Sequence, residues 1–266
     1  MTETILAVPT NAHPTARPIA HLNAHLDAPP ADNQLLASLT AAEWCRWQPH
    51  VVSADLALGQ VLCESGSTPS FVYFPSTAIV SLLYMTQDGE SAEFAVVGND
   101  GVVGISAFMG GNATPSRSVV QSAGQAWRIS AHAVRNDAFG AGASLPMLLR
   151  YTQALIAQVA QTAMCNRYHT IDEQLCRRLL LGLDRSPTDE LLMTQEGMAQ
   201  LLGVRREGVT AAALKLQLAG VIRYRRGRIA VLDRHRLEQR SCECYAAAKR
   251  ECDRLQPPRE RTAVYA

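Results

Sequence analysis

Apolar residues recur at helical spacing over residues 194–218, and a single glycine divides this segment in two. Thr194 is suited to begin the first helix, because its hydroxyl can accept a hydrogen bond from an otherwise unpaired amide of the first turn. Gly203 is suited to end it, because glycine adopts the left-handed backbone of a tight helix exit. The buried side of the second helix, from about residue 205 to 218, is expected to consist of Val209, Ala212, Ala213 and Leu216. The pattern predicts a helix, a tight turn and a second helix.

Residues 221–231 alternate between apolar and polar side chains around Arg226-Gly227, which predicts two short strands joined by a turn. A hairpin directly after a helix-turn-helix is typical of a winged helix, in which the start of the second helix meets base edges in DNA. Arginine can donate twice to guanine, and a carboxylate can accept from cytosine. The residues predicted to contact bases are Arg205, Arg206 and Glu207. Those predicted to contact phosphates are Thr210, Arg223, Arg225, Arg226 and Arg228.

The distribution of charge favours DNA binding over an ordinary helical domain, in which an Arg-Arg-Glu run is only a solvated helix start. Residues 169–266 hold 18 of the 25 Lys and Arg residues but 13 of the 24 Asp and Glu residues, a balance of +5. The rest of the chain has a balance of −4, and the whole chain carries +1. A basic C-terminal segment beside an acidic body indicates a separate nucleic-acid-binding module.

Residues 51–129 are strand-like and are interrupted by glycines at intervals typical of an all-β roll. Residues 87–90 predict a turn between two strands, because Asp-Gly readily adopts the positive φ of a hairpin. A short amphipathic helix is predicted before this segment, at residues 35–47.

A long helix is predicted over residues 144–168, with Pro146 in its first turn. Its apolar positions recur in steps of four and three residues, which gives a heptad-like seam that must be buried. The seam could pack on the chain's own β-roll, but a partner helix fits better, because helix-turn-helix proteins usually bind two-fold DNA sites. The residues predicted to form the homodimer interface are Leu148, Thr152, Leu155, Val159 and Thr162.

The chain of 266 residues is long enough for two domains with real cores, and the predicted fold class is α+β. We expect a disordered tail at 1–32, a β jelly-roll sensor domain at 33–143, a dimerisation helix at 144–168 and a winged helix-turn-helix at 169–266. No segment approaches about 18 uninterrupted apolar residues, which excludes a membrane span. The N-terminus lacks the basic start and apolar core of a secretory signal, so we expect a cytoplasmic protein.

The seven cysteines are odd in number and scattered, so disulfides are not expected. Cys242, Cys244 and Cys252 are clustered, but with no histidine close to them in the sequence they do not form a convincing zinc pattern. We interpret them as incidental thiols of a C-terminal helix and predict no metal and no cofactor. An oxygen-labile iron–sulfur cluster would need closely spaced N-terminal cysteines, which the sequence lacks.

The order of the predicted parts resembles the Crp/Fnr family of bacterial transcription regulators over residues 33–255. The closest motifs are Val72-Tyr73-Phe74-Pro75, Gly101-Val102-Val103-Gly104 and the stretch 193–220. The resemblance implies a sensor domain of the cyclic-nucleotide-binding type, a dimer formed through the long helix, and binding to palindromic promoters in double-stranded DNA. It makes RNA polymerase a further candidate partner.

Within that resemblance, Arg206 and Glu207 fall where the cyclic-AMP-responsive branch of the family places its base-reading Arg and Glu. Ala211 stands where that branch has a second base-reading arginine. The DNA half-site is therefore expected to share part of its core with sites of that branch and to differ in the rest.

The resemblance also implies an effector site, for which the candidates are Gly101, Gly104, Arg117 and Ser118. The cyclic-nucleotide branch holds the ribose with a Glu in the glycine turn, and Val102 in this turn offers no carboxylate. Arg117 beside a glycine-rich turn can bind an anion, or it can simply cap a strand. We expect a DNA-binding regulator gated by an unidentified effector; the alternatives are a cyclic-nucleotide-responsive activator and an effector-independent regulator with a degenerate sensor.

An enzymatic function is not expected. A metal-dependent cupin would need two or three histidines and a carboxylate facing one cavity. Residues 51–129 contain no histidine, and the candidate haem ligands Cys63, His132 and His169 are isolated in the sequence.

Overall fold

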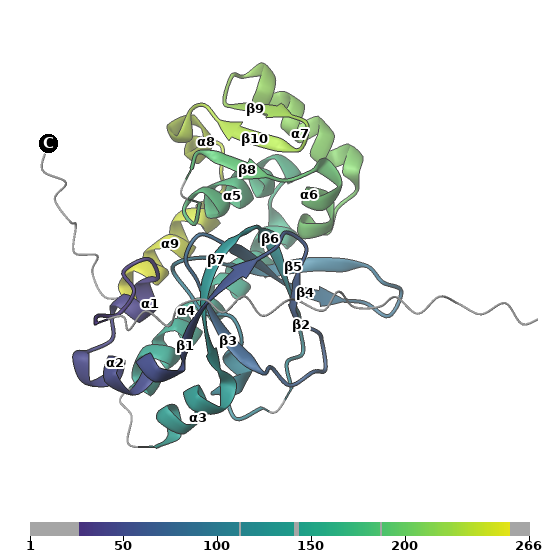
Figure 1. Cartoon of the computed structure of the whole chain (residues 1–266). Coiled ribbons are helices and arrows are strands. Elements are labelled where there is room, and N and C mark those ends of the chain that lie inside the picture. Colours follow the sequence, from purple (N-terminus) through teal and green to yellow (C-terminus); the bar gives the residue numbers. More distant parts are fainter. Residues whose placement is uncertain (1–26, 112, 141–143, 187, 256–266) are drawn as a thin grey trace, which may run out of the picture.

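The computed structural model describes residues 27–111, 113–140, 144–186 and 188–255. It consists of a lower lobe built around a β-roll and an upper lobe in which helices surround a small sheet (Figure 1). Helix α4 (Leu145–Tyr168) packs against the roll and leads into the upper lobe. With 46% helix and 24% strand, this arrangement confirms the predicted α+β fold class.

Two short helices stand where the sequence predicted one. Helix α1 (Gln34–Ala37) is separated from α2 (Ala41–Trp47) because Thr40 begins a new helix. The Thr40 side chain accepts a hydrogen bond from the Glu43 amide, and the Glu43 carboxylate accepts one from the Thr40 amide. This reciprocal capping satisfies two amides that a helix start otherwise leaves unpaired.

Buried Asn33 fixes the beginning of the folded chain. Its Oδ1 caps α1, and its amide Nδ2 donates to the carbonyls of Pro75 (2.9 Å) and Gly101 (3.0 Å). Asp32 accepts a hydrogen bond of 2.8 Å from the indole nitrogen of Trp127. The last residue of the tail predicted at 1–32 is therefore attached to the roll, while residues 1–26 lie outside the described part of the chain.

The β-roll consists of two antiparallel sheets that enclose the lower core. One has the strand order β1-β7-β3 and the other the order β2-β6-β4-β5. The strands are β1 (Val51–Leu56), β2 (Val61–Cys63), β3 (Phe71–Pro75), β4 (Ile79–Met85), β5 (Ser91–Val97), β6 (Arg117–Ser122) and β7 (Gly124–Ser130). The turn predicted at residues 87–90 joins β4 to β5, with Gly89 at a φ of 87°. Neither η2 (Ile105–Ala107) nor α3 (Ala131–Phe139) was predicted.

Helix α4 packs its predicted seam against this chain's own β-roll. Leu148, Thr152 and Leu155 are 0%, 3% and 5% exposed, and Val159 packs against the same core. These side chains are therefore occupied within one chain, which corrects their assignment to a partner helix. The physical reason is that α4 carries a second apolar stripe, one residue further along, and that stripe is the one left exposed at Leu149 (46%) and Ile156 (62%).

The upper lobe contains the predicted winged helix-turn-helix. After α4 the chain forms α5 (Ile171–Leu183), β8 (Glu190–Leu192), α6 (Gln195–Leu202), α7 (Arg206–Leu218), β9 (Ile222–Arg225), β10 (Arg228–Val231), α8 (Arg234–Gln239) and α9 (Glu243–Leu255). In the lower lobe, a 3₁₀ turn η1 (Gln48–His50) precedes the roll. Strand β8 completes a three-stranded sheet with β10 and β9. Helix α9 returns to pack against α4. No helix in the described ranges is long and apolar enough to span a membrane.

Ion pairs made by two buried arginines join the two lobes. Arg178 of α5 contacts Glu93 of β5 at 2.5 Å, and Arg185 contacts Asp100 at 2.6 Å. Ile79 and Val96 of the roll also belong to the hydrophobic core of the upper lobe. The winged helix is thus packed onto the roll rather than tethered loosely to it.

Candidate DNA-binding interface and sensor region

Local sequence signals set the orientation of α7. Thr194 caps α6 by accepting from the Gly197 amide at 3.0 Å, and Gly203 ends α6 with a φ of 64°. Arg205 is the extended N-cap residue of α7. The predicted inner face of α7 is confirmed, because its four apolar residues are at most 3% exposed: Val209, Ala212, Ala213 and Leu216.

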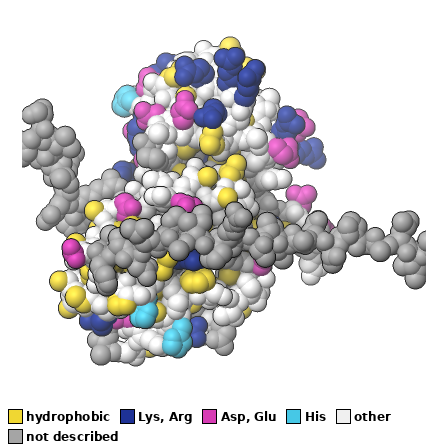
Figure 2. Space-filling view, in the orientation of Figure 1, with side chains coloured by type: hydrophobic (Ala, Val, Ile, Leu, Met, Phe, Trp, Pro, Cys, Tyr) yellow, Lys and Arg dark blue, Asp and Glu magenta, His cyan; other side chains and the backbone are white. Residues whose placement is uncertain are grey.

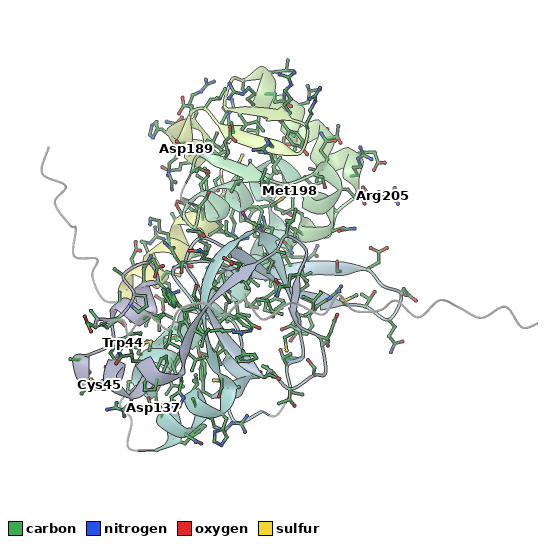
Figure 3. All side chains as sticks on the ribbon, viewed as in Figure 1. Trp44, Cys45, Asp137, Asp189, Met198 and Arg205 are labelled. Carbon is green, nitrogen blue, oxygen red and sulfur yellow. The ribbon has the colours of Figure 1, made fainter. Side chains whose placement is uncertain are left out.

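The start and opposite face of α7 present the predicted base-reading residues, and the predicted phosphate contact Thr210, to solvent. Arg205, Arg206, Glu207 and Thr210 are all exposed. The Thr210 hydroxyl lies 2.9 Å from the Gln195 side-chain oxygen and 3.0 Å from the Arg206 carbonyl. Figure 3 shows Arg205 at the outer edge of the upper lobe and Met198 inside it. The geometry suits entry into a major groove, and the contacts with bases stay a prediction.

The wing has the predicted two-residue turn. Arg226 and Gly227 have φ values of 49° and 76°, the combination that the favoured type of hairpin turn requires. Tyr224 fixes the wing to the start of the helix-turn-helix by donating to the Met193 carbonyl at 3.1 Å. The exposed wing arginines are Arg223, Arg225, Arg226 and Arg228. Figure 2 shows Lys and Arg side chains gathered over this lobe.

A large open groove of about 1310 Å³ separates the helix-turn-helix from the β4–β5 hairpin. Residues 84–86 and 88–92 form one wall, and the other includes Glu196, Arg205, Arg206 and Glu207. The predicted base-reading end of α7 therefore faces the hairpin of the β-roll in this arrangement of the lobes. No local sequence pattern predicted that these two parts would face each other.

The predicted effector residues are distributed over both sheets. The turn 101–104 is bridged to β3 through Val103 and Tyr73, whereas Arg117 and Ser118 lie on β6 of the other sheet. Arg117 Nε lies 3.1 Å from Glu64 Oε2, and Ser118 is buried. Gly104 has a φ of 101°, which favours glycine. The structure gives no contact that unites these residues into one anion site.

Helix α4 closes the space next to the glycine turn. A Cβ atom at Gly101 would lie 2.6 Å from the hydroxyl oxygen of Tyr151, and Val102 is fully buried in the core. Burial raises the pKa of Tyr151, and the nearby Asp100 carboxylate acts in the same direction. The cavity lined by Tyr151, Asp100 and Arg185 has a volume of about 10 Å³, which is at the limit for a single water molecule.

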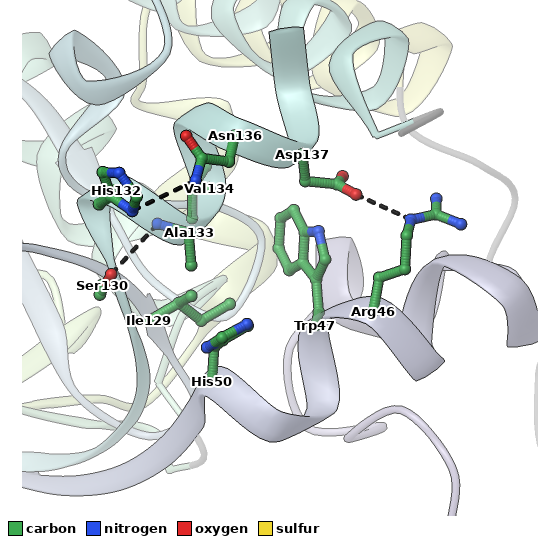
Figure 4. A pocket seen from close by; sticks show the side chains of 10 residues that line it. All are labelled: Arg46, Trp47, His50, Ile129, Ser130, His132, Ala133, Val134, Asn136 and Asp137. Carbon is green, nitrogen blue, oxygen red and sulfur yellow. Dashed lines mark hydrogen bonds and ion pairs between the residues drawn. The ribbon is translucent and has the colours of Figure 1, made fainter. Parts of the chain in front are cut away.

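A pocket of about 470 Å³ lies between α2, η1 and α3 (Figure 4). Arg46 Nε contacts Asp137 Oδ1 at 2.8 Å, and Trp47, His50 and His132 complete much of the wall. Burial acts to raise the pKa of Asp137, but hydrogen bonds from Ser144 and Arg46 outweigh it, and the pKa is lowered. None of the predicted effector residues lines this pocket.

Two of the three cysteines interpreted as incidental thiols lie close to a histidine in the folded chain. Cys242 and Cys244 lie beside Cys165 and His169, so that one ligand atom from each residue falls within 4.8 Å of the others. The sequence pattern missed this cluster because more than 70 residues separate its two halves. Cys252 is not part of it.

The β-roll, the long helix and the winged helix, together with two matching family models, identify a DNA-binding transcription regulator. A family model for a cyclic nucleotide-binding domain matches residues 55–136, and one for a Crp-like helix-turn-helix domain matches residues 173–240. The chain belongs to the Crp/Fnr family of transcription regulators. No curated protein matches the chain.

Solved structures of transcription regulators share the fold. FixK2 from Bradyrhizobium japonicum matches with a TM-score of 0.61 and 15% identity, over 72% of this chain and 98% of that one. A Crp/Fnr-family transcriptional regulator from Thermus thermophilus matches with a TM-score of 0.58 and 19% identity, over 71% of this chain and 97% of that one. The c-di-GMP-responsive regulator CLP from Xanthomonas campestris matches with a TM-score of 0.57 and 16% identity, over 72% of this chain and 99% of that one.

Proposed function

We propose that this regulator binds two-fold-symmetric DNA as a homodimer, with the start of α7 in the major groove and the wing on the phosphates. The observation that carries the proposal is the position of Arg206 and Glu207. Both are exposed on the first turn of a helix whose opposite face is buried, and four exposed arginines lie on the adjacent hairpin. Selection of bound duplexes from a random pool, followed by footprinting, tests it directly. An inverted repeat is expected, with half-sites about one helical turn or a multiple of it apart.

The exposed stripe of α4 supports a homodimer. Leu149, Gln153, Ile156, Ala160 and Ala163 are all exposed and follow one another in steps of four and three residues. This is the spacing at which two helices pack along a shared seam. A second copy of α4 would cover Ile156, which is 62% exposed in one chain. The proposal moves the dimer seam by one residue from the position that the sequence pattern favoured.

An effector would act by changing how the lobes are packed. In the present arrangement Arg205, Arg206 and Glu207 face the β4–β5 hairpin across the groove. The ion pairs Glu93–Arg178 and Asp100–Arg185 hold that arrangement. A ligand shifts such an equilibrium only by its different affinity for the two arrangements. We therefore propose that the signal, whatever its chemistry, weakens these contacts and frees the base-reading surface.

The packing around the glycine turn favours a signal other than a cyclic mononucleotide. Val102 is buried where the cyclic-nucleotide branch offers a carboxylate, and the neighbouring cavity has only about 10 Å³. An effector-independent regulator is the second candidate, and the same packing supports it. The c-di-GMP response of CLP makes that dinucleotide a further ligand to assay. We expect the protein to act in the cytoplasm, with RNA polymerase as a partner and without catalytic activity.

A further inference from the structure

Four side chains with metal-binding atoms converge where α4 meets α9. Cys165 is near the C-terminal end of α4, and His169 is its C-cap residue. Cys242 and Cys244 flank the first residue of α9, Glu243. The three cysteines are 0%, 6% and 2% exposed and form a hydrophobic cluster of their own. The thiols are therefore shielded from solvent and lie together.

Two separations between ligand atoms are close to those of a tetrahedral metal site. Cys165 Sγ and Cys242 Sγ are 3.5 Å apart, and Cys244 Sγ and His169 Nδ1 are 3.6 Å apart. Around a zinc ion with ordinary bond lengths, two sulfurs lie roughly 3.8 Å apart, and a sulfur and a nitrogen roughly 3.5 Å. All four atoms lie within 4.8 Å of one another, so small side-chain rotations would complete the tetrahedron.

The surroundings of the four residues also suit a metal ion. His169 presents Nδ1 to Cys244, while its Nε2 lies 3.3 Å from the Glu243 carboxylate. A histidine ligand characteristically donates its other ring N–H to a carboxylate, which fixes the ring and its tautomer. Gln174 donates to the carbonyls of His169 (2.9 Å) and Cys165 (3.4 Å) and so holds the backbone that carries both ligands.

The charge of the site is balanced by a buried arginine. Three thiolates and a neutral imidazole around a divalent cation carry a net charge of −1. Arg177 is 5% exposed, and its guanidinium acts electrostatically on both Cys165 and Cys244. Its Nη2 donates to the Thr162 hydroxyl at 2.9 Å, which holds it beside α4. A buried cation here offsets the cost of burying an anionic metal centre.

We infer that Cys165, His169, Cys242 and Cys244 form a zinc site that joins the end of the dimerisation helix to the C-terminal helix. Four protein ligands leave no open coordination position, which is the mark of a structural rather than a catalytic centre. The ion would connect α4 to α9 where the chain passes into the winged helix at α5. Zinc occupancy would thus fix the position of the DNA-binding lobe independently of any ligand in the β-roll.

The decisive measurement is the metal content of the full-length protein, purified under reducing conditions without a polyhistidine tag. We expect about one zinc per chain. Replacement of zinc by Co²⁺ should give the intense visible and near-ultraviolet bands of tetrahedral thiolate-bound cobalt. Cys244→Ser should weaken Zn²⁺ binding by more than about 100-fold, and Glu243→Gln by about 10- to 100-fold. Cys252→Ser is the matched control, because Cys252 lies on the same helix outside the cluster and should bind zinc as the wild type does.

Three results would overturn the inference. One is wild-type protein with neither zinc nor a cobalt–thiolate spectrum. Another is folded Cys244→Ser protein with unchanged zinc affinity. The third is a Cys165–Cys242 disulfide in protein isolated under reducing conditions, since the thiols would then serve another purpose. If Cys244→Ser does not fold, the cobalt titration of the wild type, competed with a chelator of known affinity, decides the question alone. The inference does not depend on DNA binding, so its failure and that of the proposed function are distinguishable.

Discussion

Arg178 of α5 and Glu93 of β5 form a buried ion pair with two close nitrogen–oxygen contacts across the boundary between the lobes. Arg178 Nε lies 2.5 Å from Glu93 Oε1, and Nη2 lies 3.0 Å from Oε2. The two side chains are only 3% and 6% exposed, and Gln121 also contacts the guanidinium. A buried arginine that loses its carboxylate partner keeps an uncompensated charge. Replacing only the Glu93 carboxylate should therefore strongly destabilise the docked arrangement of the lobes.

Glu93→Gln should therefore destabilise the docked lobes, by about 3–5 kcal/mol in that arrangement. Because docking makes the start of α7 face the β4–β5 hairpin, we expect effector-free DNA affinity to rise. A binding titration, with limited proteolysis to detect separated lobes, measures both effects. Asp55→Asn is the control and should change neither, because Asp55 is exposed on β1 of the other sheet and does not line the groove. Separated lobes with unchanged or weaker DNA binding would contradict the proposed gating.

Arg206→Ala and Arg225→Ala should weaken DNA binding in different ways. Loss of a base contact at Arg206 should cost about 1–3 kcal/mol and relax the preference at one symmetric pair of positions. Loss of a phosphate contact at Arg225 should weaken all sequences alike and flatten the salt dependence. Titrations against cognate and altered duplexes at several salt concentrations separate the two outcomes.

Arg250→Ala is the control for overall charge, because Arg250 is an exposed cation on α9, outside the helix-turn-helix and the wing. Wild-type affinity and selectivity in both variants would show that DNA is bound elsewhere. We choose Arg225 for the wing because Arg226 has a positive φ of 49°, so a substitution there would also change the strain of the turn.

The winged helix could be predicted from the sequence because its signals are local. Thr194 and Gly203 fix the ends of α6, and Arg226-Gly227 fixes the turn of the wing, each through the backbone it prefers. Periodicity could not decide which stripe of α4 faces the roll, because Leu148–Leu155 and Leu149–Ile156 have the same spacing, one residue apart. The contact between the lobes and the cysteine cluster depend on residues far apart in the chain, which only tertiary packing brings together.

Substitutions at two neighbouring residues of α4 should therefore affect different properties, the oligomeric state at Ile156 and the stability of the fold at Leu155. Ile156→Glu places a charge in the exposed stripe and should yield a folded monomer that loses binding to a two-half-site operator. Leu155→Ala leaves a cavity in the roll and should lower the free energy of unfolding by about 2–5 kcal/mol while the dimer persists. Analytical ultracentrifugation and chemical denaturation measure the two properties. An Ile156→Glu protein that stays dimeric would place the interface on another surface.

The lowered pKa of Asp137 predicts that the stability of the folded protein depends on pH. Its pKa in the folded protein lies below the ordinary value, so its ionised form contributes stability that is present above the unfolded pKa. That stability is lost as the pH falls below about 4 and through the folded pKa. Asp137→Asn should be less stable than the wild type near neutral pH and should lose less stability on acidification. Urea denaturation across this range measures the difference, and parallel curves for the two proteins would count against it.

Calorimetry with cyclic AMP, cyclic GMP and c-di-GMP tests the sensor region. We expect no detectable heat from the two mononucleotides, because Val102 offers no carboxylate to a ribose and Tyr151 of α4 packs against Gly101. Arg117 is also paired with Glu64, so an entering phosphate would have to displace that carboxylate. Micromolar binding of a mononucleotide that disappears in Arg117→Ala would restore the cyclic-nucleotide-responsive alternative. Binding of c-di-GMP that survives Arg117→Ala would instead place an effector site away from the predicted residues, and the pocket between α2 and α3 would be the first surface to mutate, at Arg46 and His132.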